Sequence, residues 1–289
     1  MCRLLLYKGC DAIVLAHLLT NPSHSLIHQS FDARLRLDHA RPINGDGHGI
    51  GYYSNDTTNH LHLTPCIYNS VIPAWNDSNL ARLAEKTRSR LVFAHIRAST
   101  AGSLSETNCH PWAYNSFMWM HNGSVASFKK IKRKLQASLT DQFYDHVQGG
   151  TDSEWSFALF LQKLQDRGVD PSRQGVDFGH SVIRAAMLDT ISQLISWIND
   201  STTNPEPSLL NFCVTDGFSV VCTRYISSKT STAASLYFIS GSKFVQIADG
   251  QYKMERKDKG QEVIMIASEP LTWDPKNPWI AVPTNCRES

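Results

Sequence analysis

The sequence predicts an α+β protein in which mainly antiparallel sheets pack in layers against helices. Three observations lead to this fold class. Strand-like runs come first, helix-like runs occupy the middle, and strand-like runs return in the last third. The links between strands resemble hairpins, which disfavours regular βαβ alternation. The chain has 289 residues, of which 42% are hydrophobic and 19% are charged, so it can bury a sizeable core.

The N-terminal part of the chain contains several expected strands. "RLLLYKG" from Arg3 has the pattern of a buried strand, and Asp11 is expected to cap a helix formed by "AIVLAHLLT". Alternating glycines in "NGDGHGIGYYS" are typical of a turn into a strand with close backbone contacts. "LVFAHIRAST" from Leu91 and "FMWMHNG" from Phe117 are two further strands, and each ends in polar residues.

Helices are expected at Val125–Leu139, Glu154–Gln165 and Val182–Ile198. The last has the clearest pattern, because its apolar residues recur at three- and four-residue steps and predict one buried stripe. These residues are Ile183, Met187, Ile191, Leu194 and Ile198. The run "KKIKRK" lies on the first of these helices and is expected to be a solvated face, with a docking surface as the alternative. "LNFCVTDGFSVVCTRY" then predicts a hairpin around Asp216-Gly217, and two strands follow.

Composition excludes several classes of protein. A formal charge of +2 is nearly balanced, so no nucleic acid is expected as a partner. The seven cysteines contain no C-x-x-C pair, and the N-terminal apolar run "LLLY" is too short for a secretion signal. No stretch approaches the roughly 18 apolar residues of a membrane span. We therefore expect a cytoplasmic protein with mostly free thiols and no membrane attachment.

A metal-binding protein is the alternative from another class, because the chain carries His60-x-His62 and Cys109-His110. Structural zinc sites usually show paired ligands at short spacing, and no such pairing occurs here. The sequence therefore predicts no metal and no cofactor, which elemental analysis would check.

Four polar stretches interrupt the apolar pattern at strand ends: Cys2-Arg3, "HIRASTAG", "NCHPW…HNGS" and "GGTDSE". Each has an ordinary structural explanation when taken alone. A cysteine near a terminus is commonly structural, an HNG triplet is commonly a turn, and Asp152 could serve only as a helix N-cap. Their order and spacing, however, suggest one shared site.

Together these stretches resemble the class II glutamine amidotransferases, the N-terminal nucleophile hydrolases whose catalytic cysteine follows Met1. With "MCR…YKG", "NGDGHGIGYY", "WMHNG" and "ASEPLTWD", the chain resembles the amidotransferase subunit of the fungal glutathione-degrading complex. The resemblance implies a four-layer αββα sandwich of two mainly antiparallel sheets. It also implies one amidotransferase-type domain over residues 1–289, with catalytic motifs in 2–160. His48 stands where the family often has an aromatic residue.

A terminal cysteine can supply both a nucleophile and a base. Its thiolate attacks, and its α-amine, with a reference pKa of about 7.7–8, accepts the thiol proton near neutral pH. This chemistry requires removal of Met1, since an embedded Cys2 would have an amide nitrogen instead. By resemblance, Cys2 is the nucleophile, and the Asn122 side-chain amide and Gly123 N–H stabilise the oxyanion.

The resemblance also assigns the recognition of a glutamyl head group. Arg97 matches the family's carboxylate-binding arginine, whose planar guanidinium can form two parallel bonds. Thr100 lies near it and could add a hydroxyl contact, and Asp152 matches the residue that pairs with the ammonium. His110 and His121 are expected to be structural.

The expected function is cysteine-dependent cleavage of a γ-glutamyl amide bond in a small substrate, either glutathione or glutamine. The fungal resemblance implies glutathione degradation together with a metallopeptidase-like partner subunit. One alternative is a γ-glutamyl amidohydrolase of thiohistidine biosynthesis, which shares this architecture. Another is an inactive scaffold that binds γ-glutamyl compounds and needs no free terminus, so that a retained Met1 would favour it.

Overall fold

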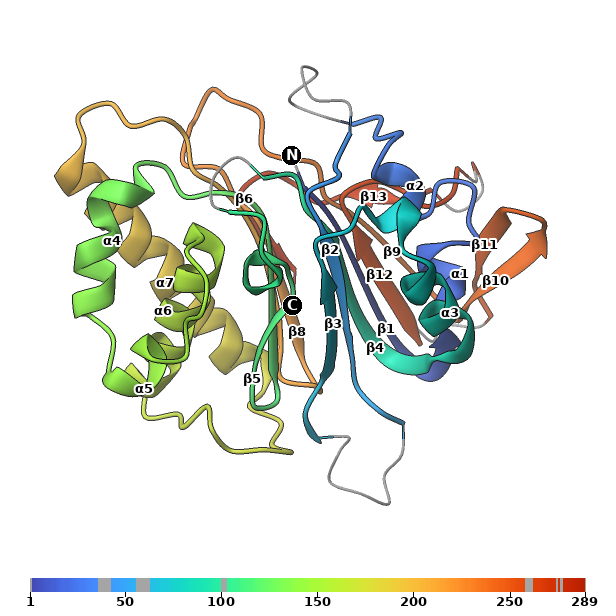
Figure 1. The fold of residues 1–289 in the computed structure, drawn as a ribbon, viewed down its shortest axis with the longest axis horizontal. Coiled ribbons are helices and arrows are strands. Elements are labelled where there is room, and N and C mark those ends of the chain that lie inside the picture. The colour runs from blue at the N-terminus through green and yellow to red at the C-terminus, as the bar shows by residue number, and fades with distance from the viewer. Residues whose placement is uncertain are drawn as a thin grey trace.

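The computed structural model describes residues 2–35, 43–55, 63–99, 103–257, 262–273, 275 and 278–288. Two mainly antiparallel sheets lie face to face in the middle of the molecule, and helices cover the outer face of each sheet (Figure 1). This arrangement confirms the predicted αββα fold class.

The larger sheet has seven strands in the order β13-β9-β12-β1-β4-β2-β3. Strand β1 is central, because its Leu5 lies opposite Ala267 of β12 on one side and Ala94 of β4 on the other. The strands are β1 (Arg3–Val14), β2 (His48–Tyr52), β3 (Cys66–Ser70), β4 (Arg88–Ile96), β9 (Tyr237–Gly241), β12 (Val263–Ala267) and β13 (Ile280–Ala281). A separate hairpin consists of β10 (Lys243–Ala248) and β11 (Gln251–Glu255).

The second sheet has five strands in the order β14-β8-β7-β6-β5. They are β5 (Trp112–Tyr114), β6 (Phe117–Ser124), β7 (Leu209–Thr215), β8 (Val220–Arg224) and β14 (Cys286–Glu288). Strands β7 and β8 form the predicted hairpin, and Gly217 in its turn has a φ of 94° that favours glycine.

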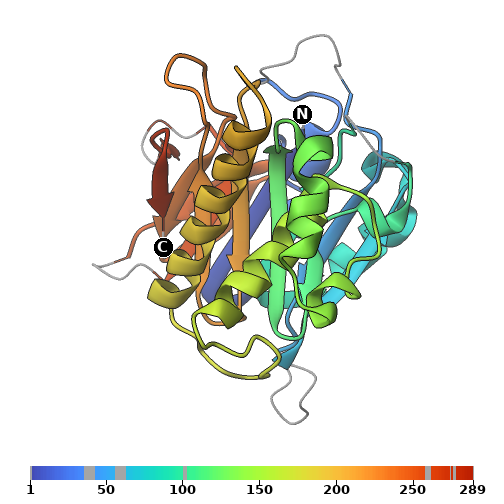
Figure 2. The same cartoon turned by 90° about the vertical axis from the view of Figure 1, so that its left-hand side faces the viewer.

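Helices form the two outer layers. Those on the larger sheet are α1 (Ala16–Leu19), α2 (Leu26–Gln29) and α3 (Ser78–Lys86). Those on the smaller sheet are α4 (Phe128–Ala137), α5 (Asp141–Tyr144), α6 (Asp152–Asp166) and α7 (His180–Ser201), with α6 and α7 crossing its outer face (Figure 2). Two short 3-10 turns, η2 (Ala74–Asn76) and η3 (Glu106–Asn108), lie in connecting segments. All five apolar residues predicted for the stripe of α7 are buried.

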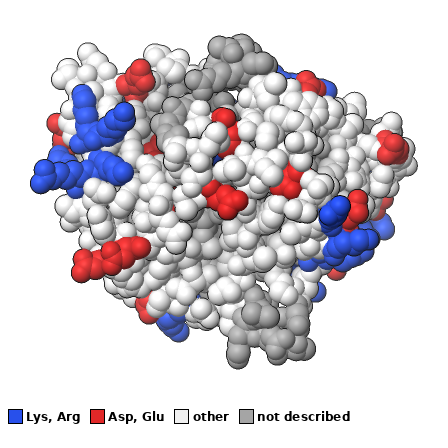
Figure 3. Space-filling model, in the orientation of Figure 1, with Lys and Arg blue, Asp and Glu red and all other residues white. Residues whose placement is uncertain are grey.

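Helix α4 carries the cationic run on its solvent-facing side. Lys129, Lys130 and Arg133 are exposed, whereas Ile131 and Leu135 are fully buried. Lys and Arg side chains gather on the side of the molecule where α4 lies (Figure 3). This distribution fits the expected solvated face.

The predicted helix cap at Asp11 is wrong, and the alternative role of Asp152 as a helix N-cap is not seen. Asp11 lies within β1, because this strand continues past an irregularity and pairs Ile13 with Ser89 of β4. Asp152 is the first residue of α6, and the N-cap is Thr151, whose hydroxyl accepts a hydrogen bond from the Glu154 N–H at 3.3 Å. The Asp152 carboxylate is therefore not used as a cap.

The apolar layer between the sheets indicates which side chains face the site. Leu4 and Leu6 of β1, Phe93 of β4, and Met118 and Met120 of β6 belong to this layer. Side chains alternate along an extended chain, so residues separated by an even number of positions face the same side. On this basis Cys2 faces the side of Leu4, Arg97 that of Phe93, and Asn122 that of Met120.

None of the helices in the described ranges combines the length and apolar character that a membrane span requires.

Candidate active site

Cys2 immediately precedes the central strand β1, and its side chain is partly buried. Its Sγ accepts a hydrogen bond from the Ala98 N–H at 3.3 Å. Burial raises the pKa of the Cys2 thiol, although the Ala98 N–H and the nearby charge of Arg97 act in the opposite direction. The thiol is therefore protonated near neutral pH and needs a base before it can act as a nucleophile.

Arg97 follows β4, and only 4% of its surface is exposed. Its Nη1 donates to the Asp46 carbonyl at 3.4 Å, and its Nη2 donates to the Ser99 hydroxyl at 3.3 Å and the Ser103 carbonyl at 3.4 Å. All of these acceptors are neutral and the bonds are long. Among the residues that the structure describes, no acid forms an ion pair with Arg97. Its charge can thus bind an anionic group.

Asn122 and Gly123 lie next to each other near the end of β6. Asn122 is fully buried, its Nδ2 lies 3.1 Å from Ser268 Oγ, and its Oδ1 has no hydrogen-bond partner. A Cβ at position 123 would lie 1.8 Å from the Leu209 carbonyl oxygen. Only glycine fits this position while β6 and β7 remain paired.

Asp152 projects from the first turn of α6 and is partly exposed. Its Oδ2 accepts a hydrogen bond from the Val125 N–H at 2.6 Å, and its Oδ1 lies 3.4 Å from the Ser153 hydroxyl. The Val125 bond places the carboxylate beside the chain as it leaves Gly123. A carboxylate can accept more bonds than these, so it has capacity for an ammonium group.

Two side chains for which the sequence predicted no role, Asn108 and Glu154, hold the loop before Asp152. Glu154 accepts hydrogen bonds from the N–H groups of Gln148 at 2.9 Å and Gly149 at 2.7 Å. Asn108 Oδ1 accepts one from Gly150 N–H at 3.0 Å. Asn108 therefore joins the "NCHPW" and "GGTDSE" stretches, and Glu154 holds the loop from the helix that follows it.

Another predicted site residue, Thr100, lies outside the described residues, so its contact remains a prediction.

Three histidines near the site are buried and hydrogen bonded. His110 Nδ1 lies 2.7 Å from His95 Nε2, and His121 lies 2.8 Å from the Ser153 hydroxyl and 2.9 Å from the Leu209 carbonyl. Burial lowers the pKa of His110 and His121, and lowers that of His95 to about 3. All three are therefore neutral near pH 7, which fits the structural role expected for His110 and His121.

His48 faces the helical layer rather than the space between the sheets. Its Nδ1 lies 2.9 Å from the Ile72 carbonyl, and its Nε2 lies 3.3 Å from Asp77 at the N-terminus of α3. It shares this side of β2 with Ile50, which packs in the core under the helices. The departure from the family's usual aromatic residue is thus on the opposite face from Cys2.

A buried ion pair holds the backbone of Cys2. Arg3 Nη1 donates to the Cys2 carbonyl at 2.9 Å, and Arg3 Nη2 lies 2.9 Å from Glu269 Oε1, with both charged side chains fully buried. Burial raises the pKa of Glu269, but its hydrogen bonds and the Arg3 charge outweigh that effect and lower it to about 2. The other partners of Glu269 are His24 Nε2 and the N–H groups of Arg34 and Leu35.

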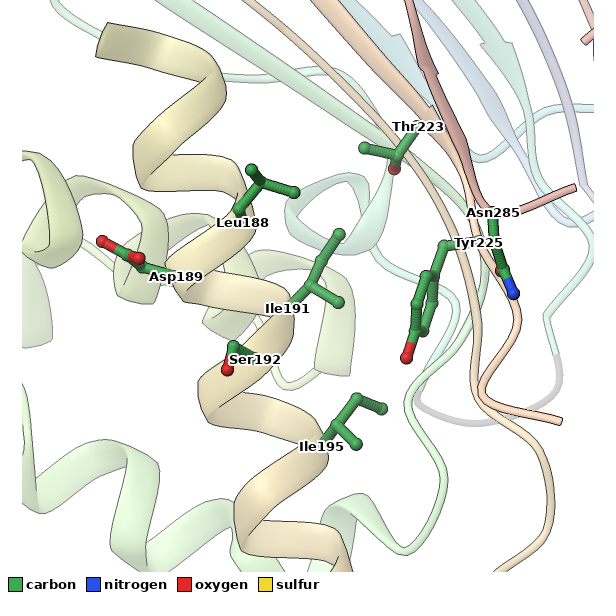
Figure 4. A pocket seen from close by; sticks show the side chains of 8 residues that line it. All are labelled: Leu188, Asp189, Ile191, Ser192, Ile195, Thr223, Tyr225 and Asn285. Carbon is green, nitrogen blue, oxygen red and sulfur yellow. The ribbon is translucent and has the colours of Figure 1, made fainter. Parts of the chain in front are cut away.

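A cavity of about 580 Å³ lies away from these residues, between α7 and β8. Ile191 and Ile195 of α7 face Tyr225 and Thr223 across it (Figure 4). No predicted site residue lines this cavity. Within the described ranges, no group of three or more His, Cys, Asp or Glu side chains is arranged to hold a metal ion.

Two relatives of known name match this chain, one over almost its whole length and one over part of it. A protein of Saccharomyces cerevisiae named probable glutamine amidotransferase DUG3 is 55% identical over 288 residues, which cover 99% of this chain and 80% of the relative. The gamma-glutamyl-hercynylcysteine sulfoxide hydrolase of Mycolicibacterium smegmatis is 31% identical over 171 residues, 59% of this chain and 65% of the relative.

Solved structures share the fold. A glutamine aminotransferase class-II domain protein from Silicibacter pomeroyi superposes with a TM-score of 0.63 at 23% identity, over 99% of this chain and 93% of that one. The glutamine phosphoribosylpyrophosphate amidotransferase of B. subtilis gives 0.51 at 10% identity, over 92% of this chain and 42% of that one.

The family model for class II glutamine amidotransferases matches residues 14–285. This match and the yeast relative confirm the predicted resemblance, and the chain is an enzyme that belongs to the class II glutamine amidotransferases.

Proposed function

We propose that this enzyme hydrolyses a γ-glutamyl amide bond with Cys2 as its nucleophile, after Met1 has been removed. One arrangement carries the proposal: Cys2 comes just before β1, Arg97 just after β4, and Asn122 near the end of β6. Strand alternation directs all three toward the space between the sheets at one end of the sandwich. Asp152 adds a carboxylate beside Gly123. These groups supply a nucleophile, a cation, an amide and an anion, which are the requirements of γ-glutamyl transfer.

In the proposed reaction, the free α-amine of Cys2 accepts the proton of the thiol. The thiolate attacks the γ-carbonyl carbon, and the Asn122 amide and the Gly123 N–H donate hydrogen bonds to the oxyanion. Collapse of this intermediate breaks the C–N bond, and the α-ammonium returns the proton to the departing amine. Water then hydrolyses the thioester by the reverse sequence, releasing glutamate and the free thiol.

Substrate recognition follows from the remaining charges. Arg97, whose hydrogen-bond acceptors among the described residues are all neutral, binds the α-carboxylate of the glutamyl group. Asp152 binds the α-ammonium, and Thr100 adds a hydroxyl contact. These three residues hold the far end of the substrate so that its γ-carbonyl lies against Cys2.

Among γ-glutamyl compounds we favour glutathione, with a metallopeptidase-like partner subunit to process the dipeptide that is released. The support is the set of fungal-type motifs together with the 55% identity to the yeast amidotransferase. Since residues 14–285 match a single amidotransferase model, we propose one domain without a second active site. The second candidate is hydrolysis of a γ-glutamyl thiohistidine precursor, favoured by the 31% identity to the bacterial sulfoxide hydrolase.

The experiment compares wild type with Cys2→Ala, after mass spectrometry of the N-terminus. Wild type should lack Met1 and cleave a γ-glutamyl substrate, and Cys2→Ala should lose about 10³-fold or more of that activity while staying folded. Cys10→Ala is the matched control, because Cys10 is an exposed thiol on β1, the strand that follows Cys2, and should be dispensable. An active preparation that retains Met1, or a fully active Cys2→Ala variant, would refute the mechanism.

Substrate choice is tested separately. Glutathione, glutamine and a γ-glutamyl thiohistidine precursor are compared by kcat/KM, with and without a candidate partner subunit. A clear preference for glutathione supports the proposal. A preference for the thiohistidine precursor would favour the second candidate. Covalent labelling of the N-terminal peptide by diazo-oxo-norleucine would test whether Cys2 is the nucleophile, whichever substrate is preferred.

A further inference from the structure

We propose that Ser268 is a positioning residue that sets the orientation of the Asn122 amide; this role rests on the function proposed above. Ser268 follows β12 and is fully buried. Its Oγ accepts a hydrogen bond from the Leu4 N–H at 3.0 Å and lies 3.1 Å from Asn122 Nδ2. A single hydroxyl therefore links the strand that follows Cys2 to the strand of the opposite sheet that carries the oxyanion amide.

In one orientation of the Asn122 amide, a donor and an acceptor at this contact have no hydrogen-bond partner among the described residues. A hydroxyl has one proton to donate and two lone pairs to accept with. If Asn122 Nδ2 and the Leu4 N–H both donate to Ser268 Oγ, the two lone pairs are used and the hydroxyl proton has no acceptor among the described residues. Asn122 Oδ1 is at the same time buried without a partner. A buried donor and a buried acceptor are then both unsatisfied.

The opposite orientation of the amide gives both of these groups a partner and leaves the amide NH2 as the group without one. The nitrogen and oxygen of an amide have nearly the same shape, so hydrogen bonding decides which atom lies where. With the amide turned by half a rotation, the Leu4 N–H still donates to Ser268 Oγ, and the Ser268 hydroxyl donates to Asn122 Oδ1. The Asn122 Nδ2 group then occupies the position that lacks a partner.

This orientation gives Ser268 a consequence for the reaction. An NH2 group without a partner in the folded enzyme keeps its protons available for the negative oxygen of a tetrahedral intermediate. The chain of bonds from the Leu4 N–H through the Ser268 hydroxyl to Asn122 Oδ1 orients this donor before substrate arrives. Ser268 does not touch the substrate, because it acts through Asn122.

The test is a double-mutant cycle of Ser268→Ala and Asn122→Ala, with kcat and KM for γ-glutamyl hydrolysis and the melting temperature of each variant. Asn122→Ala should lower kcat by about 10²–10³-fold. Ser268→Ala should lower kcat by roughly tenfold or more and leave KM within about twofold of wild type, since Arg97 and Asp152 bind the head group. The double variant should be no slower than Asn122→Ala alone. Ser268 acts only by orienting the Asn122 amide, so its loss has no further effect once that amide has been removed.

Ser268→Thr keeps the hydroxyl and should restore most of kcat, which a merely structural effect of a buried side chain would not require. If Ser268→Ala does not fold, Ser268→Cys replaces it in the double-mutant cycle, because cysteine has a similar size and is a weaker hydrogen-bond donor. Effects of Ser268 and Asn122 that multiply independently, or a loss confined to KM, would overturn the role of Ser268 while wild type remains active. A wild type that cleaves no γ-glutamyl compound would refute the proposed function itself.

Discussion

Replacing Glu269 with glutamine removes one charge from the buried ion pair behind Cys2 and keeps the size of the side chain. Arg3 would keep its 2.9 Å bond to the Cys2 carbonyl but lose its anionic partner in a fully buried position. The Arg34 and Leu35 N–H groups donate to different oxygens of Glu269, so a glutamine would present an NH2 donor to one of these two N–H groups.

The magnitude follows from the pKa of Glu269, which folding lowers from 4.5 to about 2. Each unit corresponds to 1.36 kcal/mol, so ionisation of this carboxyl contributes about 3 kcal/mol to the free energy of unfolding at neutral pH. Breaking a buried pair by removal of one partner typically costs about 3–5 kcal/mol. We therefore expect Glu269→Gln to lower the free energy of unfolding by about 3 kcal/mol at pH 7.

The pH dependence gives a second check. Because the folded pKa is depressed, this stability is present above pH 4.5 and is lost as the pH falls toward about 2. The difference between wild type and Glu269→Gln should thus be constant from pH 7 to about 5.5 and shrink at lower pH.

Urea unfolding followed by tryptophan fluorescence at several pH values measures this difference. Glu85→Gln is the matched control, since Glu85 is exposed on α3, and its effect should stay within about 0.5 kcal/mol. A Glu269→Gln variant within about 1 kcal/mol of wild type at pH 7, or a difference independent of pH down to 3, would refute this reasoning.

Three further substitutions test other parts of the structure. Gly123→Ala should lower the melting temperature and abolish activity, because its methyl group would lie 1.8 Å from the Leu209 carbonyl oxygen; an unchanged melting curve would contradict this. Arg97→Lys should raise KM by about tenfold with a smaller decrease in kcat, since lysine keeps the charge but loses the planar guanidinium group. A decrease in kcat as large as the increase in KM would argue against carboxylate binding. His48→Phe should lose about 1–2 kcal/mol of stability with its bond to Ile72 but leave KM within twofold, as measured by denaturation and steady-state kinetics.

Elements with a strong internal period were predictable from sequence, and those decided by distant pairing were not. The stripe of α7 needs only its own spacing, and the structure buries it as expected. Asp11 looks like a helix cap, yet the segment after it extends β1, because Ile13 and Val14 pair with β4 about 75 residues away. Such pairing overrides local preference and leaves no signal near Asp11.

The same distinction applies to the site. Cys2, Arg97, Asn122 and Asp152 stand in recognisable stretches at the ends of apolar runs, so motif and strand period together could place them. The partners that hold them were not predictable, because Ser268 contacts Leu4 from 264 positions away in the sequence. Nothing in the letters "ASEPLTWD" indicates that a serine there meets an amide of the opposite sheet. The pairing of β12 with β1 places Ser268 beside Leu4, and the packing of the two sheets brings Asn122 to it.

The position of Cys2 directly before the central strand β1 explains why the proposed mechanism depends on a terminal amine. Burial raises the pKa of its thiol, and the histidines nearby are neutral and already hydrogen bonded. Among the described residues, these rings are therefore poor bases for the thiol, since their pKa values are lowered. An α-amine on the same residue needs no further positioning by the fold. Removal of Met1 would then supply, in one step, the base that this buried site otherwise lacks.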